Sequence, residues 1–129
     1  MNEPIMSRIA IILLALVMAV FGVYHFVYPQ NLLAYVPSFL PDAGNLWVYL
    51  PGAAFILTAI ALITRRMVKV ACYALAILLL IFVITIHVPN YLNAGDADVR
   101  QGEFMNILKD TAIAAFAMHV AANTGTELI

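Results

Sequence analysis

Charge is the scarcest property of this chain of 129 residues. Asp, Glu, Lys and Arg make up only 10% of the sequence, whereas 65% of the residues are hydrophobic. A soluble domain usually carries about 25% charged residues, and a small one needs much polar surface to cover its core. The formal net charge of −1 also leaves no basic field to hold a nucleic acid. The composition therefore argues against a soluble domain and a nucleic-acid partner, and predicts one integral membrane domain, residues 1–129, in the lipid bilayer.

Cysteine is almost absent, because Cys72 is the only one. A lone thiol forms no internal disulfide and no Cys-x-x-Cys pair, which argues against a quinone-coupled thiol–disulfide oxidase. We interpret Cys72 as a small buried apolar residue. Walker loops, dinucleotide fingerprints, nucleophile elbows and zinc-ligand spacings are also missing. We therefore expect no metal site and no independent enzyme.

Long apolar runs are what the chain has in abundance. Four runs approach the roughly 20 residues that cross a bilayer as a helix, at about 7–27, 45–64, 69–88 and 99–123. They are rich in Ala and Leu and do not alternate, which favours helices over strands. Pro89 should end the third helix. The predicted fold is an all-α bundle of four transmembrane helices.

The proline-rich segment 30–41 is predicted as a loop on the outer side, between the first two helices. It is too short to span, and its apolar residues allow it either to lie flat at the interface or to tuck back over the bundle. Arg8, Arg65, Arg66 and Lys69 fall on the opposite side of the apolar runs. The positive-inside rule therefore places both chain ends in the cytoplasm.

Two features predict close helix packing. Gly22 and Gly52 are expected to let their helices approach each other. The last helix is rich in alanine, and Ala115 and Ala122, seven residues apart, share one of its faces. We expect the buried alanines of this helix to pack against neighbouring helices.

Aromatic residues gather near the outer helix ends. Tyr and Trp suit this level because their rings are apolar and their tips polar. Ordinary interfacial anchoring and a rim around a binding surface are both open interpretations. The predicted rim comprises Tyr24, Tyr28, Tyr35, Trp47, Tyr49 and Tyr91.

Polar residues at the same level form the candidate outer site. They come from the ends of three predicted helices, and the set is His25, His87, Asn90, Asn106, Lys109 and Asp110. The two histidines could act as hydrogen-bonding residues, proton carriers or metal ligands. Axial ligation of haem by these histidines is disfavoured, because two histidines at one depth are the only feature of the sequence that would support it.

Lys109 is the strongest signal in this set. An unpaired ammonium at membrane depth costs a few kcal/mol or more, so we expect Lys109 to face the bundle, within reach of a histidine or Asn90. Asp110 follows Lys109 in the sequence and so lies about 100° further around the helix. An ion pair between the two therefore cannot be assumed. The alternative is that Lys109 extends along its stem to the outer headgroups.

Several of these segments resemble the DoxX family of small four-helix membrane proteins. The similar stretches are GVYHFVYP at 22–29, YVP at 35–37, LP at 40–41, Trp47, PG at 51–52, HVPN at 87–90 and NILKD at 106–110. The resemblance implies a multi-pass protein of the bacterial cytoplasmic membrane. Some DoxX relatives are associated with oxidoreductase complexes, so the resemblance also implies such an association. Relatives often carry an acidic residue early in the second helix, where this chain has Ala53, Ala54 and Phe55, which weakens any role that needs a carboxylate there.

Two functions follow as hypotheses. The first is an auxiliary or anchoring subunit of a membrane oxidoreductase, with oxidoreductase subunits as partners and quinone as the candidate cofactor. The second is a non-catalytic module that binds a lipid or small amphiphile, or stabilises a partner. A homo-oligomer is compatible with either, and a transporter is a more distant third.

Overall fold

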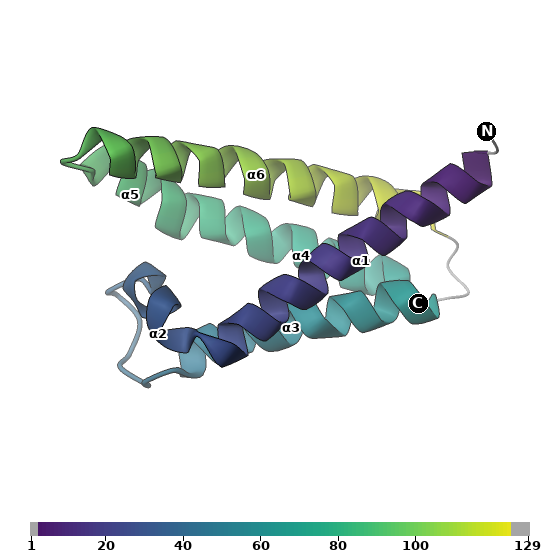
Figure 1. Ribbon diagram of the computed structural model, residues 1–129, viewed down its shortest axis with the longest axis horizontal. Helices are drawn as coiled ribbons and strands as arrows, with labels where there is room; N and C mark the ends of the chain where they lie inside the picture. Colours follow the sequence, from purple (N-terminus) through teal and green to yellow (C-terminus); the bar gives the residue numbers. More distant parts are fainter. Residues whose placement is uncertain (1–2, 125–129) are drawn as a thin grey trace.

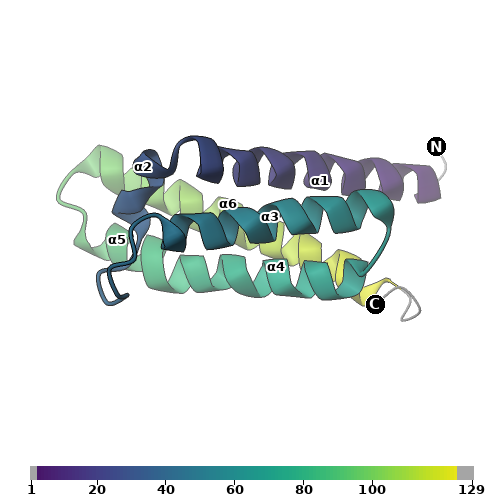
Figure 2. The ribbon, with the colours of Figure 1, turned by 90° about the horizontal axis from the view of Figure 1, so that it is seen from below.

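The computed structural model describes residues 3–124, which are mostly helical and contain no strand. Two helix pairs make up the bundle: α1 (Glu3–Val27) crosses α3 (Leu46–Thr64), and α6 (Ala97–Ala122) runs along α4 (Val68–Phe82) (Figure 1). Figure 2 shows α3 and α4 lying next to each other, which joins the two pairs. The short helices α2 (Pro29–Leu32) and η1 (Leu33–Tyr35) lead from α1 towards α3.

Three helical segments are long and apolar enough to cross a membrane: Pro4–Val27, Leu46–Thr64 and Val68–Asn93. Their large apolar side chains point outwards, as Val20, Leu57 and Ile84 do with exposed fractions of 67%, 65% and 68%. Surfaces of this kind are stable against lipid tails and not against water. The described chain is therefore helical, and three of the four expected spans are confirmed as helices long and apolar enough to cross a membrane. The fourth, α6, carries charges along its first half and does not reach the same apolarity.

The third span does not end at Pro89 as the sequence predicted. A five-residue π-helix, η2 (Val83–His87), follows α4 directly, and α5 (Val88–Asn93) continues it. The N–H of Val88 donates to the carbonyl of Val83, which makes the wider π turn. Pro89 lies in the first turn of α5, where a missing N–H costs little because no partner is required there. The helix therefore restarts at the proline instead of stopping.

Gly22 and Gly52 bring α1 and α3 into close contact, as the sequence predicted. A Cβ added to Gly22 would lie 2.5 Å from Cγ1 of Ile56 and 2.9 Å from the carbonyl oxygen of Gly52. A Cβ added to Gly52 would lie 2.7 Å from Cβ of His25. Neither position has room for a methyl group, so the crossing of α1 and α3 depends on both glycines.

The packed core occupies the half of the bundle that holds the α3–α4 turn. Met18, Leu62, Cys72 and Leu75 are its largest fully buried side chains, and the burial of Cys72 confirms its expected structural role. The face of α6 that packs here carries Ala114, Ala117 and Ala121, whereas Ala115 and Ala122 are exposed. The face that Ala115 and Ala122 share is therefore not the packed one, and the alanines that pack are those on the stripe that turns towards α4.

Candidate functional site

His87 lies between two carboxylates in the other half of the bundle. Its side chain is buried at the end of η2, with Nδ1 3.0 Å from Oε1 of Glu103 and Nε2 3.2 Å from Oδ2 of Asp110. A carboxylate accepts hydrogen bonds and does not donate them, and each ring nitrogen of His87 lies within hydrogen-bonding distance of one. The geometry places the imidazole between two carboxyl groups, a position that suits its protonated form.

Glu103 is the most highly bonded member of this cluster. It is 5% exposed, and its oxygens accept from Asn90 Nδ2 at 2.6 Å and from Asn106 Nδ2 at 2.8 Å, as well as from His87. A buried carboxylate is tolerated only when it is paired and hydrogen-bonded. Within residues 4–124, no buried side-chain nitrogen or oxygen lacks a partner. The charge of Glu103 is thus fully compensated by α5, η2 and its own helix.

Asp110 connects the cluster to Lys109. Its side chain is 6% exposed, and Oδ1 lies 3.4 Å from Nζ of Lys109 while Oδ2 faces His87. Nζ of Lys109 also lies 4.9 Å from the centroid of the Phe21 ring on α1, a cation–π arrangement. The side chain of Lys109 remains 45% exposed. Two cations and two carboxylates thus balance, and Lys109 is the accessible end of the network.

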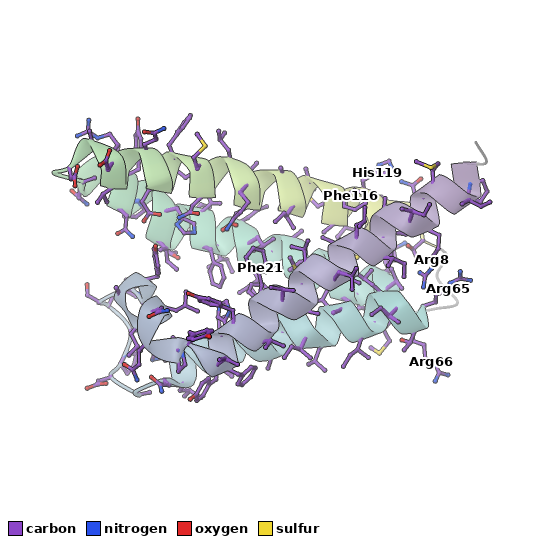
Figure 3. All side chains as sticks on the ribbon, viewed as in Figure 1. Arg8, Phe21, Arg65, Arg66, Phe116 and His119 are labelled. Carbon is purple, nitrogen blue, oxygen red and sulfur yellow. The ribbon has the colours of Figure 1, made fainter. Side chains whose placement is uncertain are left out.

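Figure 3 places Phe21 where α1 faces the α4–α6 pair, so the contact with Lys109 joins the two halves of the bundle. The expected direct contact between Lys109 and a histidine or Asn90 is not made. Lys109 reaches His87 only through Asp110, the neighbour whose pairing could not be assumed. Adjacent helical residues can pair here because the long lysine stem reaches back around the helix.

His25 is not a member of the cluster. Its Nδ1 lies 2.6 Å from the carbonyl oxygen of Phe21, one turn earlier on α1, and its ring contacts the edge of Phe55 at a centroid distance of 5.2 Å. The structure therefore brings together five of the six candidate residues, namely His87, Asn90, Asn106, Lys109 and Asp110. His25 faces them from the other helix pair, across a cavity.

This cavity has a volume of about 740 Å³ and lies between the α1–α3 pair and the α4–α6 pair. Its walls are largely apolar and include Phe21, Phe55 and Phe82. One side presents polar groups from the cluster and its surroundings, namely Thr85, His87, Asn106, Lys109 and Asp110, and His25 lines the cavity from the other helix pair. The arrangement offers an apolar volume with a charged, hydrogen-bonding patch, which is the form of many small-molecule sites.

The segment between α1 and α3 covers this cavity. Leu32, Val36, Pro37 and Leu40 are among its lining residues, and the ring of Tyr35 lies 6.2 Å from that of His87. Of the two arrangements that the sequence left open, the structure has the one in which the segment tucks back over the bundle. In Figure 1 the segment closes the side where the two helix pairs diverge.

The six aromatic residues of the predicted rim fall into two groups. Tyr24, Tyr35 and Trp47 line the cavity. The other three pair outside it: Tyr28 with Tyr24, Tyr49 with Phe26, and Tyr91 with Phe104. The structure therefore places half of the set at the cavity and half away from it.

Glu103 is the residue of this cluster that the candidate site predicted from the sequence did not include. Spacing could have identified it, because Glu103, Asn106 and Asp110 follow the i, i+3, i+7 pattern of one helix face. His87 and Asn90 are likewise three apart and face them. Across residues 3–124, no group of three or more His, Cys, Asp or Glu side chains is arranged to hold a metal ion.

Comparison with known families gives one match. Residues 14–121 match the family described as "Domain of unknown function (DUF8561)". The chain belongs to this family. No curated protein and no solved structure matches the chain. The DUF8561 match spans the whole polar cluster and the cavity, and it leaves the resemblance to the DoxX family as a hypothesis.

Proposed function

We propose that this DUF8561 protein is a membrane-embedded binding module for a small amphiphile, which it holds in the cavity between its two helix pairs. The observation that carries the proposal is an apolar cavity of about 740 Å³ whose polar side ends in a half-exposed ammonium. Volumes of about 300–1,000 Å³ are typical of sites for small molecules. The alkyl part of the ligand lies among Phe21, Phe55 and Phe82, and its head lies at Lys109.

The cluster favours a head group that accepts hydrogen bonds. Lys109 is 45% exposed while its partner Asp110 is 6% exposed, so the cation is what a ligand meets first. An ammonium has three donors and no acceptor, which suits a carbonyl or a carboxylate. The carboxylates stay bonded to His87, Asn90 and Asn106 and hold this cation in place.

A quinone is one ligand that satisfies both requirements, and this supports the second candidate function. Its carbonyl oxygen would accept from Lys109, and its isoprenoid tail would follow the apolar walls. The role would then be that of an auxiliary or anchoring subunit beside a membrane oxidoreductase, as the DoxX resemblance implies. The protein would bind and position the quinone, and the oxidoreductase partner would supply the redox chemistry.

The proposed membrane arrangement has four crossing helices with both ends in the cytoplasm of a bacterial-type cell. Support for α6 as the fourth is its length, since 26 residues extend about 39 Å at 1.5 Å per residue. Its charges also turn inwards, because Glu103 and Asp110 are buried against η2 and α5. A polar helix can cross lipid when its charged groups face protein.

Trp47 provides a direct test, because it is the only tryptophan and it lines the cavity. Decyl-quinone and a bromine-labelled alkyl carboxylate both quench indole fluorescence on contact. We expect saturable quenching of the purified protein in detergent by at least one of them. Quenching that rises linearly with both probes, as for a tryptophan octyl ester dissolved in the same micelles, would overturn the proposal.

Lys109 variants test the head-group site. Lys109→Met should lower the affinity of saturable binding about tenfold or more, because the accessible cation is lost. The melting temperature should change little, because the rest of the cluster keeps its contacts. Lys109→Arg should restore binding incompletely, since a planar guanidinium does not match a site shaped around an ammonium. Lys69→Met is the matched control, because Lys69 lies in α4 at the opposite end and does not line the cavity. Equal loss of binding in the Lys69 and Lys109 variants would contradict the assignment.

A further inference from the structure

The end of the bundle opposite the cavity carries most of the positive charge. Arg8, Arg65, Arg66 and Lys69 are four of the six basic residues, and they surround the start of α1 and the α3–α4 turn. Figure 3 shows Arg8, Arg65 and Arg66 together at this end. The acidic side chains that the structure describes belong to the opposite half or its loops: Asp42, Asp96, Asp98, Glu103 and Asp110. We call this end the basic end.

A groove at the basic end combines apolar and cationic walls. It has a volume of about 430 Å³ and runs along the first turns of α1, past Pro4, Ile5, Ile9, Ile12 and Leu13. Among residues 4–124, Arg8 and Arg65 are the charged residues that line it. In the proposed orientation its apolar length lies against acyl chains, while the two arginines lie at headgroup level.

Arg8 is fixed in place by the end of α3. Its Nη1 donates to the carbonyl of Leu62 and its Nη2 to the carbonyl of Ile63, each at 3.0 Å. These carbonyls belong to the last turn, where the helix leaves them without intrahelical partners and where the helix dipole favours a cation. Two bonds use only part of the guanidinium's donor set. Arg8 is therefore held rigidly in the groove and still has N–H groups for a ligand.

Arg65 reaches the same groove from an unusual backbone conformation. It ends α3 in the left-handed region with φ of 61°, and its N–H donates to the carbonyl of Ala61. Glycine is the residue that most readily adopts this conformation at a helix end. The side chain of Arg65 is thus placed at the groove at some cost to the backbone, which also means that Arg65→Gly can remove it without strain.

We propose that this groove is a specific binding site for an anionic phospholipid, whose phosphate is held by Arg8 and Arg65 and whose acyl chain lies along Ile5, Ile9 and Leu13. Guanidinium groups bind phosphate oxygens bidentately, so two of them suit a phosphate that lacks its own cation. Basic pockets at the cytoplasmic ends of transmembrane helices bind such lipids in general. The apolar wall explains why the ligand is a lipid, since free phosphate would leave it unused. This site is separate from the cavity and does not depend on the function proposed for it.

The test uses the full chain in detergent with three probes: dioctanoyl phosphatidylglycerol, dioctanoyl phosphatidylcholine and inorganic phosphate. Native mass spectrometry measures the bound fraction, and a thermal shift measures the stabilisation. We expect retention of the phosphatidylglycerol alone. Arg65→Gln and Arg65→Gly should each lower its affinity about fivefold, the effect of one basic residue at an anionic headgroup. Arg66→Gln is the matched control, because Arg66 carries the same charge one residue away and does not line the groove.

Three results would overturn the inference. Equal binding of the two lipids would show that the charge of the headgroup is not recognised. An equal effect of Arg65→Gln and Arg66→Gln would show diffuse attraction to a basic surface. Stabilisation by inorganic phosphate to the same extent would show an anion site without lipid selectivity. Arg8 is left unchanged in this test because its loss would also release the end of α3.

Discussion

At the scale of single residues, the protein pairs the carboxylates that it buries. His87, Glu103, Asp110 and Lys109 form one chain of contacts in which positive and negative groups alternate. Burying any of them alone would cost several kcal/mol. The apolar composition and the buried charges are therefore compatible, because the charges neutralise one another inside the bundle.

Glu103→Gln tests how much this network stabilises the fold. Glutamine has the shape of glutamate but only one acceptor oxygen, so at least one of His87, Asn90 and Asn106 would face another donor. We expect the free energy of unfolding to fall by about 3–5 kcal/mol, as when one partner of a buried pair is removed. Thermal unfolding in detergent, followed by circular dichroism, measures the change.

Asp98→Asn is the comparison for this variant. Asp98 is an exposed acidic residue in the first turn of α6, so its loss should cost less than about 1 kcal/mol. Similar melting temperatures for the two variants would mean that Glu103 does not hold the cluster together.

At the scale of helices, the sequence predicted most of what the structure contains, and its failures have local causes. The first two long helices begin and end close to the expected residues, because apolar length and proline placement define them. Pro89 misled the prediction because its effect depends on the turn before it, and a π-helix has no clear signature in one sequence. The packed face of α6 could not be predicted either, since alanines occur on every side of that helix.

A pair of glycine substitutions tests the contact between α1 and α3. Gly52→Ala would place a methyl group 2.7 Å from Cβ of His25, and α1 would have to shift. We expect a loss of about 1–3 kcal/mol, the usual cost of overpacking. Gly102→Ala should instead stabilise α6 by about 0.5–1 kcal/mol, because nothing lies within 4 Å of its added Cβ. Chemical unfolding in mixed micelles distinguishes them, and changes of the same sign would refute the close contact.

Leucine substitutions test which face of α6 is packed. Ala117 has no exposed surface and lies in the core, whereas Ala115 is exposed two residues earlier. Ala117→Leu should lower stability by about 1–3 kcal/mol, and Ala115→Leu should change it by less than about 0.5 kcal/mol. Melting curves of both variants provide the measurement, and a larger loss for Ala115→Leu would mean that α6 packs through its other face.

At the scale of the whole molecule, one half of the bundle is a packed core and the other half contains the cavity. Composition predicted a membrane bundle, and spacing predicted that polar groups from separate helices lie at one depth. The cavity could not be predicted, because it arises from the divergence of two helix pairs and from a loop that closes over it. The sequence also offered no reason to separate His25 from the other candidate residues. It predicts at which depth of the bundle a residue lies, but not towards which side of its helix the side chain points.

Topology is the prediction that belongs to this scale. Arg8, Arg65, Arg66 and Lys69 share one end of the bundle, so the positive-inside rule places that end in the cytoplasm. A reporter joined after Ile129 should be active in its cytoplasmic form, and a reporter inserted at Gly44 should be active in its external form. Matching activity of one reporter at both positions would contradict the odd number of crossings proposed between them, and with it the proposed orientation.

The π-helix at Val83–His87 makes the chain tolerant of a change in length at one point. A π turn closes with an i→i+5 hydrogen bond, so it holds one residue more than an α turn over about the same rotation. Deleting Ile84 would therefore let the segment close into a regular α-helix while His87 and Asn90 still face Glu103. A regular α turn has no such spare residue, because each residue removed from it rotates everything beyond by about 100°.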